Sequence, residues 1–286
     1  MFLGTPDAAV PTLRALHDAG YDIALVVTQP DRRRGRGAAL TPSPVKAAAV
    51  GLGLPVSHRV DDVLATGAEL GVVVAFGKLI KPHVLAAVPM VNVHFSLLPR
   101  WRGAAPVERA ILAGDAETGV CVMELEAGLD TGPVLGSRVV PIGPDTTAAA
   151  LRQDLSVAGT SLLLAMLRDG LPPGEPQVGE TTYAAKIDPA ELQLDWTTPA
   201  DQLDRVVRVG RAWTTFRGRR LGVAEAAVGA AGALAPGEID GVLVGTGDGT
   251  LELLSVHPEG RAVMSAAAWA NGARPAPGER FGAVTP

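Results

Sequence analysis

The chain has 286 residues, 47% of them hydrophobic, a formal net charge of −5 and a single cysteine. Its length suits two domains, and its hydrophobic content excludes extensive disorder. No apolar run reaches the roughly 18 residues of a membrane span, and no basic-then-apolar signal peptide opens the chain. Cys121 alone can form neither an internal disulfide nor a metal cluster. We therefore expect a cytoplasmic enzyme or binding protein that uses neither a membrane nor a metal.

Apolar and amphipathic segments alternate through the first half of the chain. Helical spacing begins at Val10 and ends before Gly20, and further helices are predicted at 44–52, 82–87 and 105–113. Strands are predicted at 2–3, 23–27, 54–56, 72–76 and 91–94. This alternation predicts an α/β domain with a doubly wound, Rossmann-like parallel sheet. Two more strands, 120–125 and 136–142, and a long helix over 146–168 complete it.

The second half of the chain has the pattern of a small β domain. Short strands are predicted at 213–216, 221–224, 241–244 and 251–256, separated by glycine-rich turns. The segment Gly245-Thr-Gly-Asp-Gly249 precedes no helix and no Lys-Ser/Thr pair, so it indicates a hairpin turn and not a phosphate loop. We expect a smaller C-terminal β-barrel of the OB-like kind. The predicted division is a catalytic domain at 1–175, a linker at 176–188 and the barrel at 189–286.

Three polar side chains lie at the ends of apolar runs. Asn92 and His94 are two apart on one predicted strand, so their side chains share a face. Asp130 lies in Gly128-Leu-Asp-Thr-Gly132, a turn that could bring its carboxylate to the imidazole. Together they offer a donor for an oxyanion, a proton carrier and a carboxylate that orients the ring. We expect acyl transfer without a covalent nucleophile if the three meet.

Each of these residues also has a purely structural interpretation. A histidine at a strand end is often a satisfied polar residue, and an aspartate among glycines is often a turn former. Ser96 lacks the Gly-x-Ser-x-Gly elbow, which counts against a serine hydrolase. Cys121 lies in a predicted strand and is expected in the core.

Basic residues are concentrated in two places on this acidic chain. Arg32, Arg33, Arg34 and Arg36 fall within five positions. A later stretch without any acidic residue contains Arg205, Arg208, Arg211, Arg217, Arg219 and Arg220. Two local patches suit selective contact with a polyanion, and the alternative is two solvated faces.

Several motifs resemble one known family, and they cover nearly the whole chain. They are Phe2-Leu-Gly-Thr-Pro6, Thr28-Gln-Pro-Asp31, Thr41-Pro-Ser-Pro-Val-Lys46, Asn92-Val-His94, Ser96-Leu-Leu-Pro-Arg-Trp-Arg-Gly-Ala-Ala-Pro106, Leu129-Asp-Thr-Gly132, Thr214-Thr-Phe-Arg-Gly218 and Pro277-Gly-Glu-Arg-Phe281. The chain resembles the methionyl-tRNA formyltransferases, within the 10-formyltetrahydrofolate-dependent formyltransferases. The stretch from Ser96 to Pro106 is the most specific part of the match.

The resemblance implies formyl transfer from 10-formyltetrahydrofolate to the α-amine of methionyl initiator tRNA, by a monomer and without a metal. Asn92, His94 and Asp130 match the catalytic residues of the family. The matched motif that lines the folate pocket is Ser96, Leu97, Leu98 and Pro99. A basic loop at 32–40 and the C-terminal domain are implied to contact tRNA, through Arg32, Arg33, Arg34, Arg36, Lys46, Arg205 and Arg208.

Two alternatives from other classes remain open. An enzyme that formylates a nucleotide-linked amino sugar would share the three catalytic residues and the folate pocket, but the basic loop and the barrel-like domain count against it. A non-catalytic RNA-binding module would make Asn92, His94 and Asp130 incidental. Normal formyl transfer after His94→Ala substitution would favour an incidental role.

Overall fold

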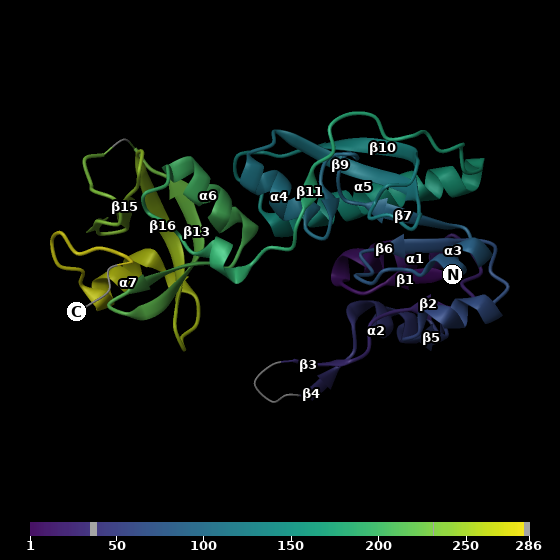
Figure 1. Ribbon diagram of the computed structural model, residues 1–286. Helices are drawn as coiled ribbons and strands as arrows, with labels where there is room; N and C mark the ends of the chain where they lie inside the picture. The colour runs from purple at the N-terminus through teal and green to yellow at the C-terminus, as the bar shows by residue number, and fades with distance from the viewer. Residues whose placement is uncertain (35–38, 231, 283–286) are drawn as a thin grey trace. The chain divides into compact units, whose positions relative to one another are not determined.

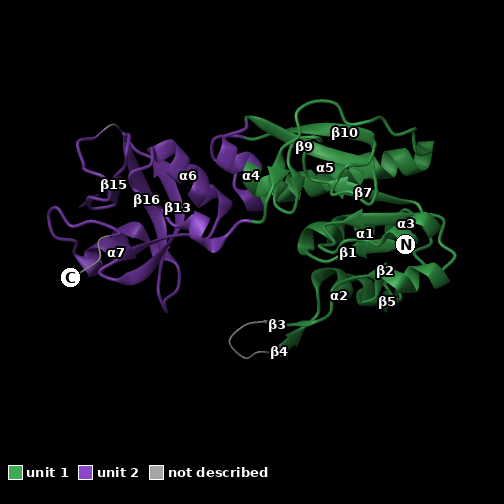
Figure 2. Ribbon diagram, viewed as in Figure 1, with its two compact units in different colours: residues 1–109, 116–142, 150–186 green, residues 110–115, 143–149, 187–286 purple. Residues whose placement is uncertain are grey.

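The computed structural model describes residues 1–34, 39–230 and 232–282, and these residues form two compact units (Figures 1 and 2). Unit 1 comprises residues 1–109, 116–142 and 150–186. Unit 2 comprises residues 187–286 together with the short segments 110–115 and 143–149. Within the described residues, no helix is both long enough and apolar enough to cross a bilayer.

A seven-stranded mixed sheet forms the centre of unit 1, in the order β10-β9-β7-β6-β1-β2-β5. The strands are β1 (Phe2–Gly4), β2 (Val26–Val27), β5 (Val56–Ser57), β6 (Gly71–Val74), β7 (Met90–His94), β9 (Glu117–Glu124) and β10 (Val134–Pro141). Pairing is parallel from β5 to β7, and β9 and β10 run antiparallel at one edge. The chain builds outward from β1 to β2 and β5, then returns to add β6 on the other side. This confirms the predicted doubly wound sheet and places its switch point between β1 and β6.

Five α-helices accompany this sheet in the chain. They are α1 (Val10–Asp18), α2 (Pro44–Gly51), α3 (Pro82–Ala87), α4 (Pro106–Ala113) and α5 (Ala148–Asp169), with the 3-10 turns η1 (Asp7–Ala9) and η2 (Val60–Ala65). Gly20 follows α1 with a φ of 82°, as expected of a helix stop. Pro6 occupies the N-cap of η1, which has no side-chain cap. Ser43 caps α2, since its Oγ accepts from the Lys46 N–H at 3.0 Å.

The segment predicted as a basic loop at 32–40 contains paired strands. β3 (Arg32–Arg34) runs antiparallel to β4 (Ala39–Thr41), with Arg32 opposite Thr41 and Arg33 opposite Leu40. The two strands project from the body of unit 1 (Figure 1). Arg36 falls outside the described residues, so its predicted contact stays a prediction from sequence.

The residues that precede unit 2 pack against the sheet domain. Glu175 forms an antiparallel bridge with Val134, with N–H···O distances of 2.8 and 2.9 Å in the two directions. Farther on, β11 (Tyr183–Ala184) pairs in parallel with β8 (Arg102–Gly103). Residues up to Lys186 therefore belong to unit 1.

Unit 2 is built on an antiparallel sheet, which confirms the predicted β-rich second domain. Its elements are η3 (Pro189–Leu192), α6 (Ala200–Val209), β12 (Ala212–Phe216), β13 (Arg219–Val228), β14 (Ile239–Asp240), β15 (Leu243–Gly245), β16 (Thr250–Pro258), β17 (Met264–Ser265) and α7 (Ala266–Ala273). β13 changes register near Glu225, which bends the strand. The predicted turn at 245–249 joins β15 to β16, with Gly245 opposite Thr250.

The core of unit 2 is aromatic at one end. Trp196 stacks on Phe281 with ring centroids 5.5 Å apart, and Phe216 meets Phe281 edge-on at 5.8 Å. Leu251 and Val256 of β16 are fully buried beside them. Aromatic pairs of this kind add directional contacts to simple burial and help to fix one packing arrangement.

Candidate active site

Asn92 and His94 lie on a central strand of unit 1. β7 is flanked by β6 and β9, so that Asn92 is opposite Val73 on one side and Met123 on the other. His94 is the last residue of β7 and lies opposite Cys121. Because side chains alternate along a strand, Asn92 and His94 project from the same face, as predicted.

The His94 ring is buried and held from both nitrogens. Its side chain is 6% exposed. Nε2 lies 3.0 Å from the backbone carbonyl of Trp101, and Nδ1 lies 3.7 Å from Oδ2 of Asp130. A carbonyl can only accept, so Nε2 must carry a proton and donate it. Trp101 presents its carbonyl from a backbone with a φ of 62°, which turns the chain back toward the strand end.

Asp130 is anchored in the loop between β9 and β10. Its Oδ2 accepts a hydrogen bond from the Gly103 N–H at 2.8 Å, and its side chain is 13% exposed. The separation of 3.7 Å from His94 is longer than a direct hydrogen bond and short enough for a strong charge interaction. The structure thus brings the predicted carboxylate to the predicted imidazole.

A cavity of about 600 Å³ opens beside these three residues. Asn92, His94 and Asp130 all line it, and so do Pro6 after β1 and the residues that follow β6. It lies at the carboxyl ends of the parallel strands, at the switch point between β1 and β6, where open α/β sheets bind their ligands. Much of its wall is apolar, from Val73, Phe76, Leu79, Ile80, Leu85, Leu125 and Leu129.

Charged residues that the sequence did not single out also line the cavity. Glu108 of α4 and Arg152 of α5 form an ion pair there, joined by a hydrogen bond between Oε1 and Nη2 of 2.5 Å. Lys78 also lines the cavity. No motif signals the pair, because its members are 44 residues apart in the sequence and lie on two different helices. Among the described residues, no group of three His, Cys, Asp or Glu side chains could hold a metal ion.

The four residues predicted to contact folate form a turn next to the cavity. Phe95 lines the cavity, whereas Ser96, Leu97, Leu98 and Pro99 are absent from its described lining. Ser96 is fully buried, and its Oγ donates to the Arg100 carbonyl at 2.6 Å. Leu97 packs against Gly119 of β9, where an added Cβ would lie 2.4 Å from a Leu97 methyl group.

Cys121 lies beneath this turn and belongs to the core, as predicted. Its Sγ accepts a hydrogen bond from the Leu98 N–H at 3.4 Å. Burial raises the pKa of the Cys121 thiol to about 11. The thiol is therefore protonated at neutral pH and cannot serve as a nucleophile.

The basic residues near β3 have different surroundings. Arg32 and Arg33 are exposed. Lys46 is engaged, because its Nζ lies 2.8 Å from both carboxylate oxygens of Asp31. A phosphate contact by Lys46 would have to compete with this ion pair.

In unit 2, two predicted tRNA-binding arginines also have carboxylate partners on α6. Arg205 pairs with Asp201 at 2.8 Å. Arg208 pairs with Asp204 at 2.8 Å and donates to the Thr146 carbonyl at 3.1 Å. Burial is the main reason that the pKa of Asp204 lies above its ordinary value. Their charges are thus partly compensated, and their contact with tRNA stays a prediction.

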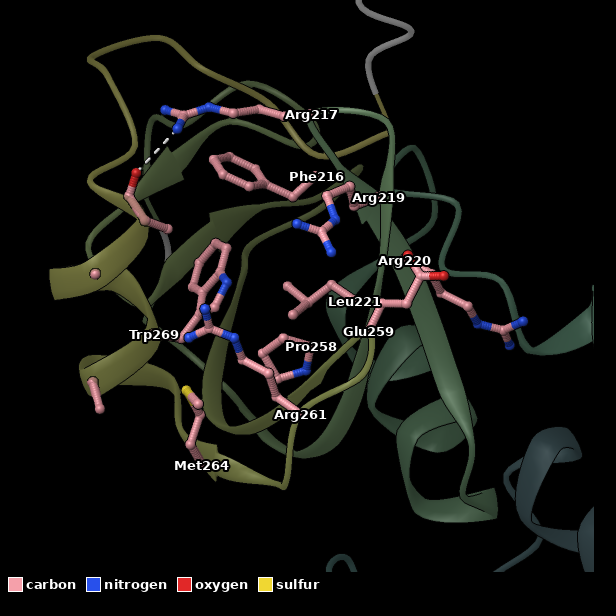
Figure 3. Close-up of a pocket in the computed structure, with 13 residues that line it drawn as sticks. Phe216, Arg217, Arg219, Arg220, Leu221, Pro258, Glu259, Arg261, Met264 and Trp269 are labelled. Carbon is pink, nitrogen blue, oxygen red and sulfur yellow. Dashed lines mark hydrogen bonds between the residues drawn. The ribbon is translucent and has the colours of Figure 1, made fainter. Parts of the chain in front are cut away.

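The later arginines surround a hollow of about 320 Å³ in unit 2 (Figure 3). Arg219 and Arg261 turn their guanidinium groups toward the hollow, whose wall includes Trp269. Arg220 points away from it and stacks over Trp213 at 4.3 Å. Arg217 is held at the rim, where it donates to the Ala273 carbonyl and pairs with Glu279. The arginine-rich stretch therefore contains ion-paired arginines, one arginine stacked on a tryptophan and one that faces the hollow.

Comparisons with known proteins agree with this geometry. Residues 1–167 match the formyl transferase family and residues 186–274 match the formyl transferase C-terminal domain. The methionyl-tRNA formyltransferase of Roseobacter denitrificans is 46% identical over 95% of both chains. That of Symbiobacterium thermophilum is 43% identical over 98% of this chain and 94% of its own.

A solved structure shares the fold at much lower identity. An N-formyltransferase from Helicobacter canadensis, in complex with folinic acid and dTDP-3-aminofucose, matches 88% of this chain and 97% of its own. Its TM-score is 0.68 and its identity is 16%, so the likeness concerns the fold. The sequence relatives and both domain matches place the chain more narrowly: it belongs to the formyl transferase family, among the methionyl-tRNA formyltransferases.

Proposed function

We propose that the chain transfers the formyl group of 10-formyltetrahydrofolate to the α-amino group of methionyl initiator tRNA. The observation that carries the proposal is the convergence of Asn92, His94 and Asp130 on one cavity at the switch point of the sheet. High identity to methionyl-tRNA formyltransferases over almost the whole chain supports tRNA as the acceptor. We expect a monomer that acts in the cytoplasm.

Asn92 is suited to stabilise the developing oxyanion. Attack of an amine on a formyl carbon places negative charge on the formyl oxygen, and Asn92 is the neutral amide of the three residues at the cavity. Its side-chain N–H groups can donate to that oxygen. One such donor is typically worth roughly 3 to 4 kcal/mol in the transition state.

His94 and Asp130 act as a pair in this proposal. Since Nε2 already donates to the Trp101 carbonyl, Nδ1 is the ring nitrogen that can take up a proton. The proton lost by the attacking α-amine would then lie beside Oδ2 of Asp130, which is anchored by the Gly103 N–H. The carboxylate therefore stabilises the charged ring, and the charged ring in turn favours the oxyanion. Collapse of the tetrahedral intermediate would break the bond between the formyl carbon and N10, and the departing nitrogen of tetrahydrofolate would take up a proton.

The apolar wall of the cavity suits a flat heteroaromatic ring. Phe76, Ile80, Leu85 and Leu125 offer hydrophobic surface of the kind that a pteridine would bury, within a cavity of about 600 Å³. When bound there, 10-formyltetrahydrofolate would supply the activated formyl carbon. Phe95, which directly precedes the turn at residues 96–99, lines the cavity. Contact of the turn itself with folate stays a prediction.

An RNA acceptor would be held away from the reacting atoms. The exposed Arg32 and Arg33 on β3 can contact phosphates, which position a nucleic acid without reading its sequence. Arg34, Arg36, Lys46, Arg205 and Arg208 complete the contact set expected from the resemblance.

A competition between acceptors tests the proposed function. The enzyme is incubated with 10-formyltetrahydrofolate, methionyl initiator tRNA and an equal concentration of a nucleotide-linked amino sugar, and both formylated products are counted. Formyl methionyl-tRNA should be by far the major product. Preferential formylation of the sugar would reject tRNA as the acceptor, and formylation of neither would reject the activity.

A further inference from the structure

The loop between β9 and β10 carries Asp130, and residues with no assigned function hold it. We propose that Gln177, oriented by Arg102, is a positioning residue that keeps this loop in place so that the Asp130 carboxylate stays beside His94. The inference rests on the proposed function, in which Asp130 takes part in formyl transfer. Its own support is a set of hydrogen bonds within unit 1.

Gln177 uses both ends of its carboxamide. Nε2 donates to the backbone carbonyls of Asp130 and Gly132, at 2.9 and 2.8 Å. Oε1 accepts from Nε and Nη2 of Arg102, at 3.0 and 2.6 Å. An arginine can only donate, so the amide oxygen must face Arg102 and the amide nitrogen must face the two carbonyls. Arg102 thereby sets the orientation in which Gln177 can hold the loop.

The backbone brings Gln177 to this position. Two residues earlier, Glu175 makes its antiparallel bridge with Val134, at the start of β10. A Cβ on Gly174 would lie 2.6 Å from Pro133, so the two segments pack closely. Gln177 therefore approaches the loop from a neighbouring segment whose own backbone is fixed.

Arg102 connects the Gln177 contact with the side chain of Asp130. Arg102 and Gly103 make up β8, and the Gly103 N–H donates to Oδ2 of Asp130 at 2.8 Å. Asp130 is consequently held at two points, its carbonyl by Gln177 and its carboxylate by Gly103. Arg102 is hydrogen-bonded to Gln177 and is followed in the chain by Gly103. Loss of the Gln177 contact should therefore loosen the hold on both the carbonyl and the carboxylate of Asp130.

The loop has few other restraints. Residues 126–129 and Thr131 are exposed, with Leu129 55% exposed. Asp130 has a φ of 50°, in the left-handed region. A residue other than glycine keeps that conformation only where surrounding contacts hold it. Gln177 supplies two of the contacts that do so.

The sharpest variant is Gln177→Glu, which keeps the shape and the Arg102 partner but removes both N–H donors. Its carboxylate would face two carbonyl oxygens, so the loop should be released. Gln153→Glu is the matched control, because Gln153 is exposed on α5 and the change in charge is the same. The first readout, on the enzyme without substrates, is hydrogen–deuterium exchange of the peptide that contains Gly103. Exchange at the Gly103 N–H should rise about tenfold in Gln177→Glu and stay unchanged in Gln153→Glu.

The second readout is formylation of methionyl-tRNA, measured as the single-turnover rate at saturating substrates and as the steady-state KM. Gln177→Glu should lower the rate by roughly 10- to 100-fold with little change in KM, because misplacement of a catalytic group affects the reacting state. In an Asp130→Asn background the same substitution should cost less than about twofold, whereas in an Asn92→Ala background it should keep its full effect.

Three results would overturn the positioning role. One is unchanged exchange at Gly103 in Gln177→Glu, and another is a wild-type rate in that variant. The third is an equal loss in the Asp130→Asn and Asn92→Ala backgrounds, which indicates a general loss of fold. If the wild-type enzyme fails to formylate methionyl-tRNA, the proposed function fails, and the exchange measurement still decides whether Gln177 holds the loop.

Discussion

His94 presents its two ring nitrogens to two different partners. Nε2 is bonded to the Trp101 carbonyl, and Nδ1 faces Asp130 at 3.7 Å. In the proposed function, a proton taken up at Nδ1 lies beside the Asp130 carboxylate, so we propose that the two groups act together. Asn92 shares their cavity and adds a neutral donor. This division of roles needs no covalent bond between the enzyme and the formyl group.

At this scale, spacing and motifs identify the three residues but not their supports. Asn92 and His94 follow from strand alternation, and Asp130 from its glycine-flanked turn. Gln177 and Arg102 are 75 residues apart, and nothing in either local pattern signals their contact. They meet between two long-range pairings, the bridge of Glu175 with Val134 and the pairing of β8 with β11, and local sequence cannot specify either.

The thiol of Cys121 gives a prediction about pH. Its pKa rises from 9.0 to about 11 on burial. Between these values the unfolded chain loses the thiol proton while the folded chain retains it, so unfolding releases a proton. The free energy of unfolding should therefore fall as pH rises from 9 toward 11.

Denaturant unfolding measured across that pH range, with Cys121→Ala for comparison, checks this expectation. Cys121→Ala should be less stable overall because it leaves a cavity, yet its stability should fall less steeply with pH. Equal slopes for the two proteins would show that Cys121 does not contribute. Other groups titrate in the same range, and the comparison of slopes cancels their effect.

Among the elements, the β9–β10 hairpin has a tight steric requirement at Gly132. A Cβ on Gly132 would lie 2.0 Å from the Glu124 carbonyl oxygen, and this atom belongs to backbone that cannot turn aside. Gly132→Ala should therefore displace the loop and destabilise the fold by about 2 kcal/mol or more, with loss of formylation.

Gly51→Ala is the matched comparison for that substitution. Gly51 lies in α2 with open space around it, so alanine there should raise stability by roughly 0.5 to 1 kcal/mol through helix propensity. Thermal unfolding of both variants measures the contrast. Equal melting temperatures for Gly132→Ala and the wild type would contradict the proposed close approach.

Element types were more predictable than element ends. The buried run of β6 is apolar throughout, and β7 is apolar except for Asn92 and His94; both strands fall where the sequence predicts them. The basic segment at 32–40 is predicted as a loop, yet it contains β3 and most of β4. The three residues of β3 are all arginines, so the segment lacks the apolar alternation from which a strand is predicted. The proline and glycine content around residues 175–184 suggests a linker. In the structure, these residues instead pair with the sheet domain, and such tertiary pairings cannot be predicted from composition.

For the whole molecule, net charge and local charge have opposite signs. The chain carries −5 overall, while Arg32 and Arg33 stand exposed on β3. Each arginine that contacts a phosphate displaces a counterion, so tRNA affinity should depend on salt. The parallel part of the sheet and the β-rich second unit follow from patterning. The antiparallel edge formed by β9 and β10, and the pairing of Lys46, Arg205 and Arg208 with carboxylates, required the structure.

Substitution of Arg33 tests this electrostatic contribution. Arg33→Ala should weaken binding of methionyl-tRNA at low salt and reduce the slope of log affinity against log salt concentration by about 1. Arg168→Ala is a suitable control, since Arg168 at the end of α5 is also exposed and pairs with the adjacent Asp169. An Arg33 variant whose salt slope equals that of the wild type would count against a phosphate contact.

The most direct measurement is the single-turnover rate of methionyl-tRNA formylation for the wild type, Asn92→Ala, His94→Ala and Asp130→Asn, together with their tRNA affinities. We expect each substitution to lower the rate by roughly 10²- to 10⁴-fold while tRNA binding changes little. Wild-type rates in all three variants would contradict the assignment of the chemistry to this cavity.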